Sequence, residues 1–262
     1  MIRMLPALAL SCAALAAPVA ASEIVSAELR PGWRTADGRH IAALHLTLSQ
    51  GWKTYWRSPG DAGIPPVFDW SGSRNAAQVR VDWPTPEVSW QGGMRSIVYH
   101  DEVVLPLTVT TQGAGDIALK GEMDLGLCKD ICLPHHLSFS AVLPAQATKP
   151  DPMIAAALAS MPYSAAEAAV RDVRCDVSLE ADGIGLRAEI EMPSAGGEEQ
   201  TVVEVGNPLI WVAEPASRRN GARLVTQTML RHVEGSAFAL DRSTVRITVL
   251  GKQHAVDIQG CR

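Results

Sequence analysis

The residues with the clearest chemical potential lie in the segment DLGLCKDICLPHH. Three residues separate its two cysteines, Cys128 and Cys132, and the segment ends in His135 and His136. A disulfide between these cysteines would close a ring that stabilises a fold by only about 2 kcal/mol, against roughly 4.5 kcal/mol for a ring of nearly ninety residues. Because so small a ring is a weak staple, the spacing favours a redox-active pair.

Two other interpretations of this segment remain open. The pair could simply staple a hairpin, or the two thiolates together with His135 and His136 could bind Cu(I) or zinc, which accept sulfur and imidazole ligands. If the histidines lie on a strand, at most one of them would face the sulfurs, because alternate side chains point to opposite faces. Under the redox interpretation we expect no bound cofactor.

The N-terminal residues indicate export. Arg3 precedes an apolar run from Met4 to Ala17, and small residues stand where signal peptidase cleaves. We therefore predict a signal peptide over residues 1–21. A lipoprotein signal that uses Cys12 fits less well, because the apolar run before it is short. No later stretch reaches about 18 uninterrupted apolar residues, so we predict that the mature chain does not span a membrane.

Export to an oxidising compartment permits disulfides. Of the five cysteines, four follow the signal peptide, and four cysteines allow three pairings. One pairing keeps each bridge within one half of the chain, Cys128 with Cys132 and Cys175 with Cys261, and the second bridge would then be structural. The net charge of -5 and the pI near 5.8 argue against a nucleic-acid partner.

The pattern of the mature chain predicts an all-β protein with two β-sandwich domains. Leu44, Leu46 and Leu48 alternate with smaller or polar residues, which is the period of a half-buried strand. Short strands of this kind, separated by Gly and Pro turns, are typical of a sandwich. We expect a first domain over residues 22–143, a linker over 144–173 and a second domain over 174–262. The other predicted strands are 67–70, 78–83, 97–110, 117–123, 137–142, 177–179, 185–192, 201–205, 209–212, 223–230, 244–250 and 255–258.

The linker is expected to contain two short helices that connect the domains. Asp151 has the features of an N-cap followed by proline in the first turn, and Pro162 would end this Ala-rich helix. Ser164 and Glu167 have the spacing of a capping box, which predicts a second helix that reaches about Val173.

Tryptophan is concentrated in the first domain. Six of the seven tryptophans lie between Trp33 and Trp90, and most of them are expected to be core or loop anchors. Trp90 is different, because it stands in a glycine-containing loop, WQGG, where a buried position is harder to arrange.

These features resemble a known family. The segments GWKTYWRSPGDAGIPPVFDW (residues 51–70), YHDEVVLPL (99–107) and LCKDICLP (127–134) are similar to the amino-terminal periplasmic domain of the DsbD thiol:disulfide interchange proteins, and most similar to the branch related to copper-sensitivity suppressors. The resemblance implies an immunoglobulin-like sandwich in the periplasm and a link to copper tolerance. Such a domain accepts electrons from a membrane-embedded thiol transporter and passes them to periplasmic thioredoxin-fold proteins, a thiol:disulfide oxidoreductase-type relay.

The resemblance also implies roles for individual residues. It makes Cys128 and Cys132 the redox pair and Cys132 the attacking thiol. The aromatic cap and its surroundings would comprise Trp90, Tyr99, Asp101 and Glu102. Acidic side chains such as Asp101, Glu102 or Asp130, if close to the sulfurs, would raise the pKa of the thiols and slow unwanted reactions.

This sequence departs from the family pattern in two ways. The spacing of the cysteines is shorter than in the best-known members, and we find no membrane domain or thioredoxin-like domain, so the electron donor is expected to be a separate protein. A third interpretation, an adaptor without redox activity whose β-domains only bind a partner, remains open.

Overall fold

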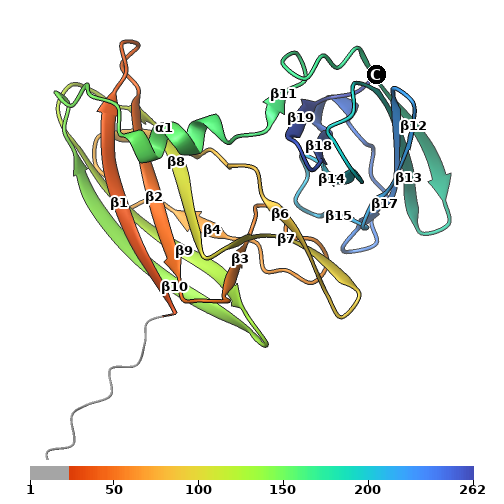
Figure 1. Ribbon diagram of the computed structural model, residues 1–262, viewed down its shortest axis with the longest axis horizontal. Helices are drawn as coiled ribbons and strands as arrows, with labels where there is room; N and C mark the ends of the chain where they lie inside the picture. The colour runs from red at the N-terminus through yellow and green to blue at the C-terminus, as the bar shows by residue number, and fades with distance from the viewer. Residues whose placement is uncertain (1–23) are drawn as a thin grey trace, which may run out of the picture.

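The computed structural model describes residues 24–262, and the predicted signal peptide lies outside the described residues. Two β-sandwiches lie side by side, joined by a linker that contains the single α-helix of the described part (Figure 1). The predicted all-β class is therefore confirmed. Each predicted strand has a counterpart, although β1, β3, β6, β11 and β16 were not predicted.

The first sandwich contains two antiparallel sheets. In the first sheet the strand order is β1 (Val25–Arg34), β2 (His40–Leu48), β8 (Glu102–Thr111) and β5 (Ala76–Val81). In the second sheet the order is β10 (Cys132–Leu143), β9 (Ile117–Cys128), β3 (Lys53–Tyr55), β7 (Met94–His100) and β6 (Glu87–Gln91), and β4 (Val67–Asp69) also pairs with β9.

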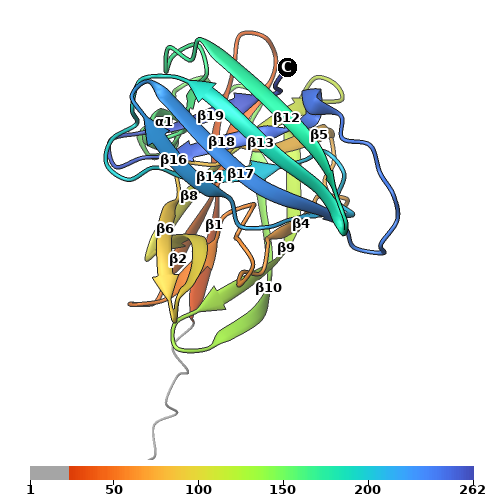
Figure 2. The same ribbon diagram turned by 90° about the vertical axis from the view of Figure 1, so that its right-hand side faces the viewer.

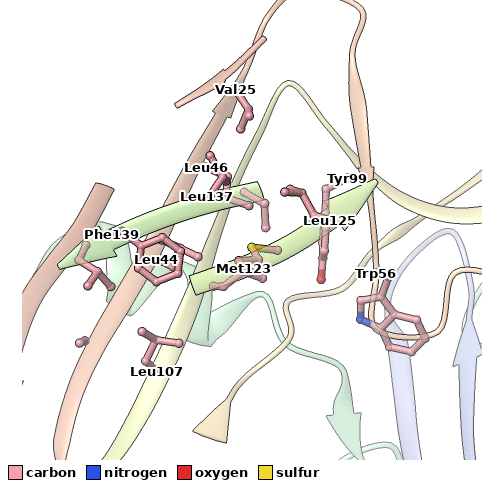
Figure 3. Close-up of a cluster of buried hydrophobic side chains, with 14 of the residues drawn as sticks. Val25, Leu44, Leu46, Trp56, Tyr99, Leu107, Met123, Leu125, Leu137 and Phe139 are labelled. Atoms are coloured by element: carbon pink, nitrogen blue, oxygen red, sulfur yellow. The ribbon is translucent and has the colours of Figure 1, made fainter. Parts of the chain in front are cut away.

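The core of this sandwich forms where the inward residues of the two sheets meet. Figure 3 shows Leu44 and Leu46 of β2 near Met123 and Leu125 of β9, all of them buried. Trp56, just after β3, is fully buried as well. The alternation of inward and outward residues along β9 has a direct consequence for the site, because it leaves Gly126 and Cys128 on the outer face.

The prediction of one strand over residues 97–110 is wrong. The chain leaves the second sheet at the end of β7 and enters the first sheet at the start of β8, with Asp101 at the corner. Asp101 has a φ of +58°, a left-handed conformation that aspartate tolerates better than most residues. Its backbone carbonyl accepts a hydrogen bond from the Leu48 amide at 2.6 Å, which fixes the corner.

The first linker helix is confirmed as α1 (Pro152–Ala159). The side chain of its N-cap residue, Asp151, accepts hydrogen bonds from the Met153 and Ile154 amides. The helix packs on the first sandwich rather than bridging the domains. Ile154 is fully buried, and Arg30 of β1 donates two hydrogen bonds to Asp151, at 3.0 and 2.7 Å.

The second linker helix is not present. The capping-box bonds do form, since the Ser164 amide donates to Glu167 and the Glu167 amide donates back to Ser164 Oγ. The segment nevertheless makes only a turn, because Ala169 adopts a positive φ of 52° and β12 begins at Asp172. One turn is too short to hold a helix without further support.

The second sandwich also contains two sheets. In one the strand order is β12 (Asp172–Glu180), β13 (Gly183–Glu191), β17 (Arg223–His232) and β15 (Ile210–Val212), with β16 (Ala216–Asn220) also paired to β17. In the other the order is β11 (Tyr163–Ser164), β19 (Ala255–Gln259), β18 (Arg246–Leu250) and β14 (Gln200–Glu204), and a 3-10 turn, η1 (Arg242–Thr244), precedes β18. A disulfide joins Cys175 of β12 to Cys261, just after β19.

The two sandwiches contact each other through two arginines of the first. Arg57 donates to both carboxylate oxygens of Glu204, at 3.0 and 2.8 Å. Arg95 of β7 is 3% exposed and donates to the Thr201 carbonyl at 3.1 Å. Apolar side chains of the second sandwich also join the core cluster of the first. They are Val202, Leu250 and Ala255.

Candidate redox site

The two cysteines of the predicted pair close the hairpin of β9 and β10. Cys128 ends β9, Cys132 begins β10, and the two face each other in the antiparallel register with a disulfide between them. Their Cα atoms are 4.1 Å apart. Because Leu125 and Leu127 of β9 point into the core, Cys128 lies on the outer face of the sheet.

The two cysteines differ in their exposure to solvent. Cys128 is 1% exposed, whereas Cys132 is an exposed residue. A small cluster on the outer face, formed by Tyr55, Val98 and Ile64, covers Cys128. An incoming thiolate can therefore reach Cys132 far more easily than Cys128.

A tyrosine lies against the disulfide. The phenolic oxygen of Tyr55 lies 2.8 Å from Cys128 Sγ and 3.3 Å from Cys132 Sγ. Burial raises the pKa of the Tyr55 phenol, so the group stays protonated and can donate to sulfur. Gly126 makes room for this ring, because a Cβ at that position would lie 2.8 Å from the Tyr55 ring.

A lysine lies beside the buried sulfur. Lys53 stands directly opposite Cys128 where β3 pairs with β9, so the two side chains share the outer face. Lys53 is 6% exposed, and burial lowers the pKa of its ammonium group. The charged residue next to Cys128 is thus a cation, whereas the sequence suggested acids.

The hairpin of β6 and β7 contacts both the lysine and the cysteine loop. Lys53 Nζ donates to Ser89 Oγ at 3.3 Å and to Gln91 Oε1 at 3.1 Å. Gln91 in turn donates to the Lys129 carbonyl, between the two cysteines, at 3.2 Å. Figures 1 and 2 show the ends of the β6–β7 and β9–β10 hairpins at the same end of the first sandwich.

Trp90 belongs to this β6–β7 hairpin. It stands between Ser89 and Gln91 and opposite Arg95, and it is 57% exposed. Alternate residues of a strand point to opposite faces, so Trp90 projects from the face opposite to the one that Ser89 and Gln91 turn toward Lys53. The role of Trp90 as a cap stays a prediction, and Gln91 is the hairpin side chain that bonds to the cysteine loop.

The other three residues implied by the resemblance make their contacts elsewhere. Tyr99 points into the core and donates to the Pro84 carbonyl at 2.7 Å. Asp101 forms the corner between β7 and β8, and Glu102 lies 3.1 Å from the His45 ring. Their proposed roles at the sulfurs remain untested.

The two histidines lie on β10 beyond the disulfide. His136 Nδ1 bonds to Asp124 of β9 at 2.8 Å, and this bond raises the pKa of His136. Within residues 24–262 no group of three or more His, Cys, Asp or Glu side chains is placed to hold a metal ion. A shallow, mostly apolar depression adjoins this strand. Its lining is Ile64, Pro65, Val67, Asp124, Leu125, Pro134, His135 and His136.

The comparisons with known proteins agree with this geometry. Residues 23–144 match the family model described as "Thiol:disulfide interchange protein DsbD, N-terminal". This part of the chain therefore belongs to the family of DsbD N-terminal domains, which confirms the resemblance found in the sequence. A role related to thiol-disulfide exchange follows for this domain.

The fold of the whole chain is similar to the crystal structure of the N-terminal periplasmic domain of ScsB from Proteus mirabilis. The match has a TM-score of 0.65 and 19% sequence identity, and it covers 90% of each chain. At this identity the likeness shows a shared fold that extends over both sandwiches. The comparison with curated proteins found no match. No helix of residues 24–262 has the length and apolar character needed to cross a bilayer.

Sequence reasoning missed Lys53, Tyr55 and Gln91. Lys53 and Tyr55 lie two residues apart in the segment GWKTYW, and this period-two spacing could have placed them on one face of a strand. The pairing of that strand with β9 depends on the fold of the whole sandwich.

Proposed function

We propose that the protein is a periplasmic thiol-disulfide exchange protein that relays electrons from a membrane thiol transporter to thioredoxin-fold proteins. The observation that carries this proposal is the disulfide between an exposed cysteine, Cys132, and a buried one, Cys128, beside the Tyr55 hydroxyl. The membership of residues 23–144 in the DsbD family supports the reaction and the class of partner, and the periplasmic origin of the ScsB domain supports the location.

The difference in exposure between the two cysteines suggests an order of events. A thiolate of the donor attacks Cys132 Sγ, the bond to Cys128 breaks, and its electron pair leaves on Cys128 as a thiolate. The second thiolate of the donor then attacks the donor sulfur of this mixed disulfide, which releases Cys132. The donor ends as a disulfide and Cys128 and Cys132 as a dithiol, so two electrons have moved.

The second half of the relay reverses these roles. The Cys132 thiolate attacks the disulfide of an oxidised thioredoxin-fold protein and forms a mixed disulfide. Cys128 then attacks Cys132 Sγ, which restores the internal disulfide and releases the partner as a dithiol. The small loop between the cysteines keeps Cys128 close enough for this step.

The surface around Cys132 suits a transient protein contact. Ile131 and Leu133, on either side of Cys132, are exposed by 64% and 36%. Met94, which pairs with Gln91 on the neighbouring hairpin, is 60% exposed. Exposed apolar side chains that gather near a reactive group are typical of an interaction site.

Trapping of the mixed disulfide tests the proposal. The Cys128→Ala variant keeps Cys132 as an attacking thiol that cannot be resolved internally, so its mixed disulfides with periplasmic thioredoxin-fold proteins should accumulate on non-reducing gels. The Cys132→Ala variant should trap far less, because Cys128 is buried. Trapping should not require metal. Equal trapping by both variants would refute the assigned polarity, and no trapping by either would favour the adaptor or metal-binding interpretation.

A further inference from the structure

One polar row crosses the outer face of the second sheet of the first sandwich. Cys132 of β10 faces Cys128 of β9, Cys128 faces Lys53 of β3, and Lys53 faces His100 of β7. Directly opposed residues of antiparallel strands have Cβ atoms roughly 4.5–5.5 Å apart. The stem of Lys53 therefore starts next to the buried sulfur.

Lys53 is an unusual residue for this position. Lysine is rarely buried without a partner, yet Lys53 is only 6% exposed. The two hydrogen bonds of its ammonium group go to Ser89 Oγ and Gln91 Oε1, which are neutral acceptors. Neither acceptor neutralises the charge, so the cation remains available to a developing anion nearby.

We propose that Lys53 is a positioning residue that stabilises the Cys128 thiolate each time the disulfide opens. The inference rests on the proposed function, in which Cys128 is both the leaving and the resolving thiol. When Cys132 is attacked, the electron pair of the broken bond moves to Cys128 Sγ, at a site almost closed to water. A thiolate in such surroundings is stabilised by a nearby cation and by hydrogen-bond donors. Lys53, which stands opposite Cys128 where β3 pairs with β9, supplies the positive charge, and the Tyr55 hydroxyl supplies a hydrogen bond.

The other charged and titratable groups near this row are more open to solvent. Lys129 follows Cys128 but is exposed, and its ammonium group donates to the Gln50 carbonyl at 3.2 Å. Asp130 in the cysteine loop and Glu87 on β6 are also exposed. His100 is only partly buried at the far end of the row. Solvent screens exposed charges more than buried ones, so Lys53 should dominate.

The thiolate of a lone Cys128 tests this role without any partner protein. In the full mature chain carrying Cys132→Ala, the ultraviolet absorbance of the thiolate is followed as a function of pH. Replacing Lys53 by methionine keeps an unbranched side chain that is one atom shorter and removes the charge. It should raise the pKa of the Cys128 thiol by about one unit, which corresponds to about a tenfold loss of thiolate at neutral pH. Lys53→Arg should largely restore the original value.

Lys129→Met is the matched control, because it removes the same charge from the cysteine loop while leaving Lys53 in place. It should shift the pKa much less. Equal shifts in the two variants, or no shift with Lys53→Met, would overturn the proposal. If Lys53→Met does not fold, Lys53→Gln keeps a polar group for Ser89 and Gln91 and should give the same shift. Because no partner takes part, failure of this titration leaves the trapping result standing, and failure of trapping leaves the titration standing.

Discussion

The phenol of Tyr55 lies 2.8 Å from the sulfur of Cys128, and both residues are almost completely buried. A hydroxyl that stays protonated beside a sulfur can donate a hydrogen bond to the thiolate once the disulfide opens. It thereby favours the charged form of the thiol and lowers its pKa.

We therefore expect Tyr55→Phe to raise the pKa of the Cys128 thiol and to slow opening of the disulfide by dithiothreitol several-fold. Loss of one hydrogen bond should cost about 1 kcal/mol of stability, because the ring remains in place. Tyr99→Phe is the control, since Tyr99 is also buried and donates to the Pro84 carbonyl. It should cost similar stability in urea unfolding yet leave the opening rate unchanged. Equal effects on the rate would assign the Tyr55 result to general loosening.

A second prediction concerns what limits access to the pair. Trp90→Ala should speed reduction by glutathione without loss of the fold if Trp90 covers the disulfide. Gln91→Ala removes the side chain that joins Lys53 to the cysteine loop, and it should also speed reduction. The reduction rates of the two variants show which of the two side chains limits access to the disulfide. Acceleration by Gln91→Ala alone would remove Trp90 from the mechanism, whereas acceleration by Trp90→Ala alone would restore the aromatic cap.

The two disulfides should open in a fixed order. Cys132 is an exposed residue and is open to attack, whereas Cys175 is 2% exposed, and its bond to Cys261 spans a sequence separation of 86. The larger ring also stabilises the fold more, by roughly 4.5 against about 2 kcal/mol. Alkylation and mass spectrometry after graded dithiothreitol should show opening of the Cys128–Cys132 bond first. Earlier loss of the Cys175–Cys261 bond would contradict both the assignment and the argument from ring size.

The ion pair between His136 and Asp124 predicts a raised histidine pKa. The bond to Asp124 raises the pKa of His136, so the folded protein holds this proton more tightly than the unfolded chain. The stabilisation is present below the unfolded pKa and is lost as the pH rises through the folded pKa. An NMR titration should find the pKa of His136 above its ordinary value, and Asp124→Asn should lower it.

Replacement of both His135 and His136 by alanine should leave thiol exchange intact. A metal site with imidazole ligands predicts the opposite. If the double variant lost both exchange activity and stoichiometric Cu(I) binding, the relay would have to be abandoned. The single variant Asp124→Asn is the control for a change in local charge.

More of the fold than of the site could be predicted from the sequence, because strands and turns are marked by patterns of neighbouring residues. Alternation along residues such as Leu44 and Leu46 marked strands, and turn residues marked their ends. The corner at Asp101 was missed because the hydrophobic pattern continues across it while the chain changes sheets. The second linker helix was predicted from a real capping interaction, but capping alone cannot sustain a helix.

The site depends on strand register, which the sequence does not encode locally. The cysteines are close in sequence and could be identified at once. Lys53 and Tyr55 are more than seventy residues away from them, and only the pairing of β3 with β9 places them at the sulfurs. The resemblance to the DsbD family identified the cysteines as the redox pair and implied which residues surround them. Three of those residues make their observed contacts elsewhere: Tyr99, Asp101 and Glu102.

The segment shared with the DsbD family ends at residue 144, but the packing of the first sandwich does not end there. Val202, Leu250 and Ala255 complete its core cluster, and the buried guanidinium of Arg95 has its hydrogen-bond acceptors on β14. Excision of the family domain at this boundary would expose apolar surface and leave the guanidinium of Arg95 without these acceptors. The segment that matches the family is therefore smaller than the unit that packs as one core, and a stable piece of this protein should include both sandwiches.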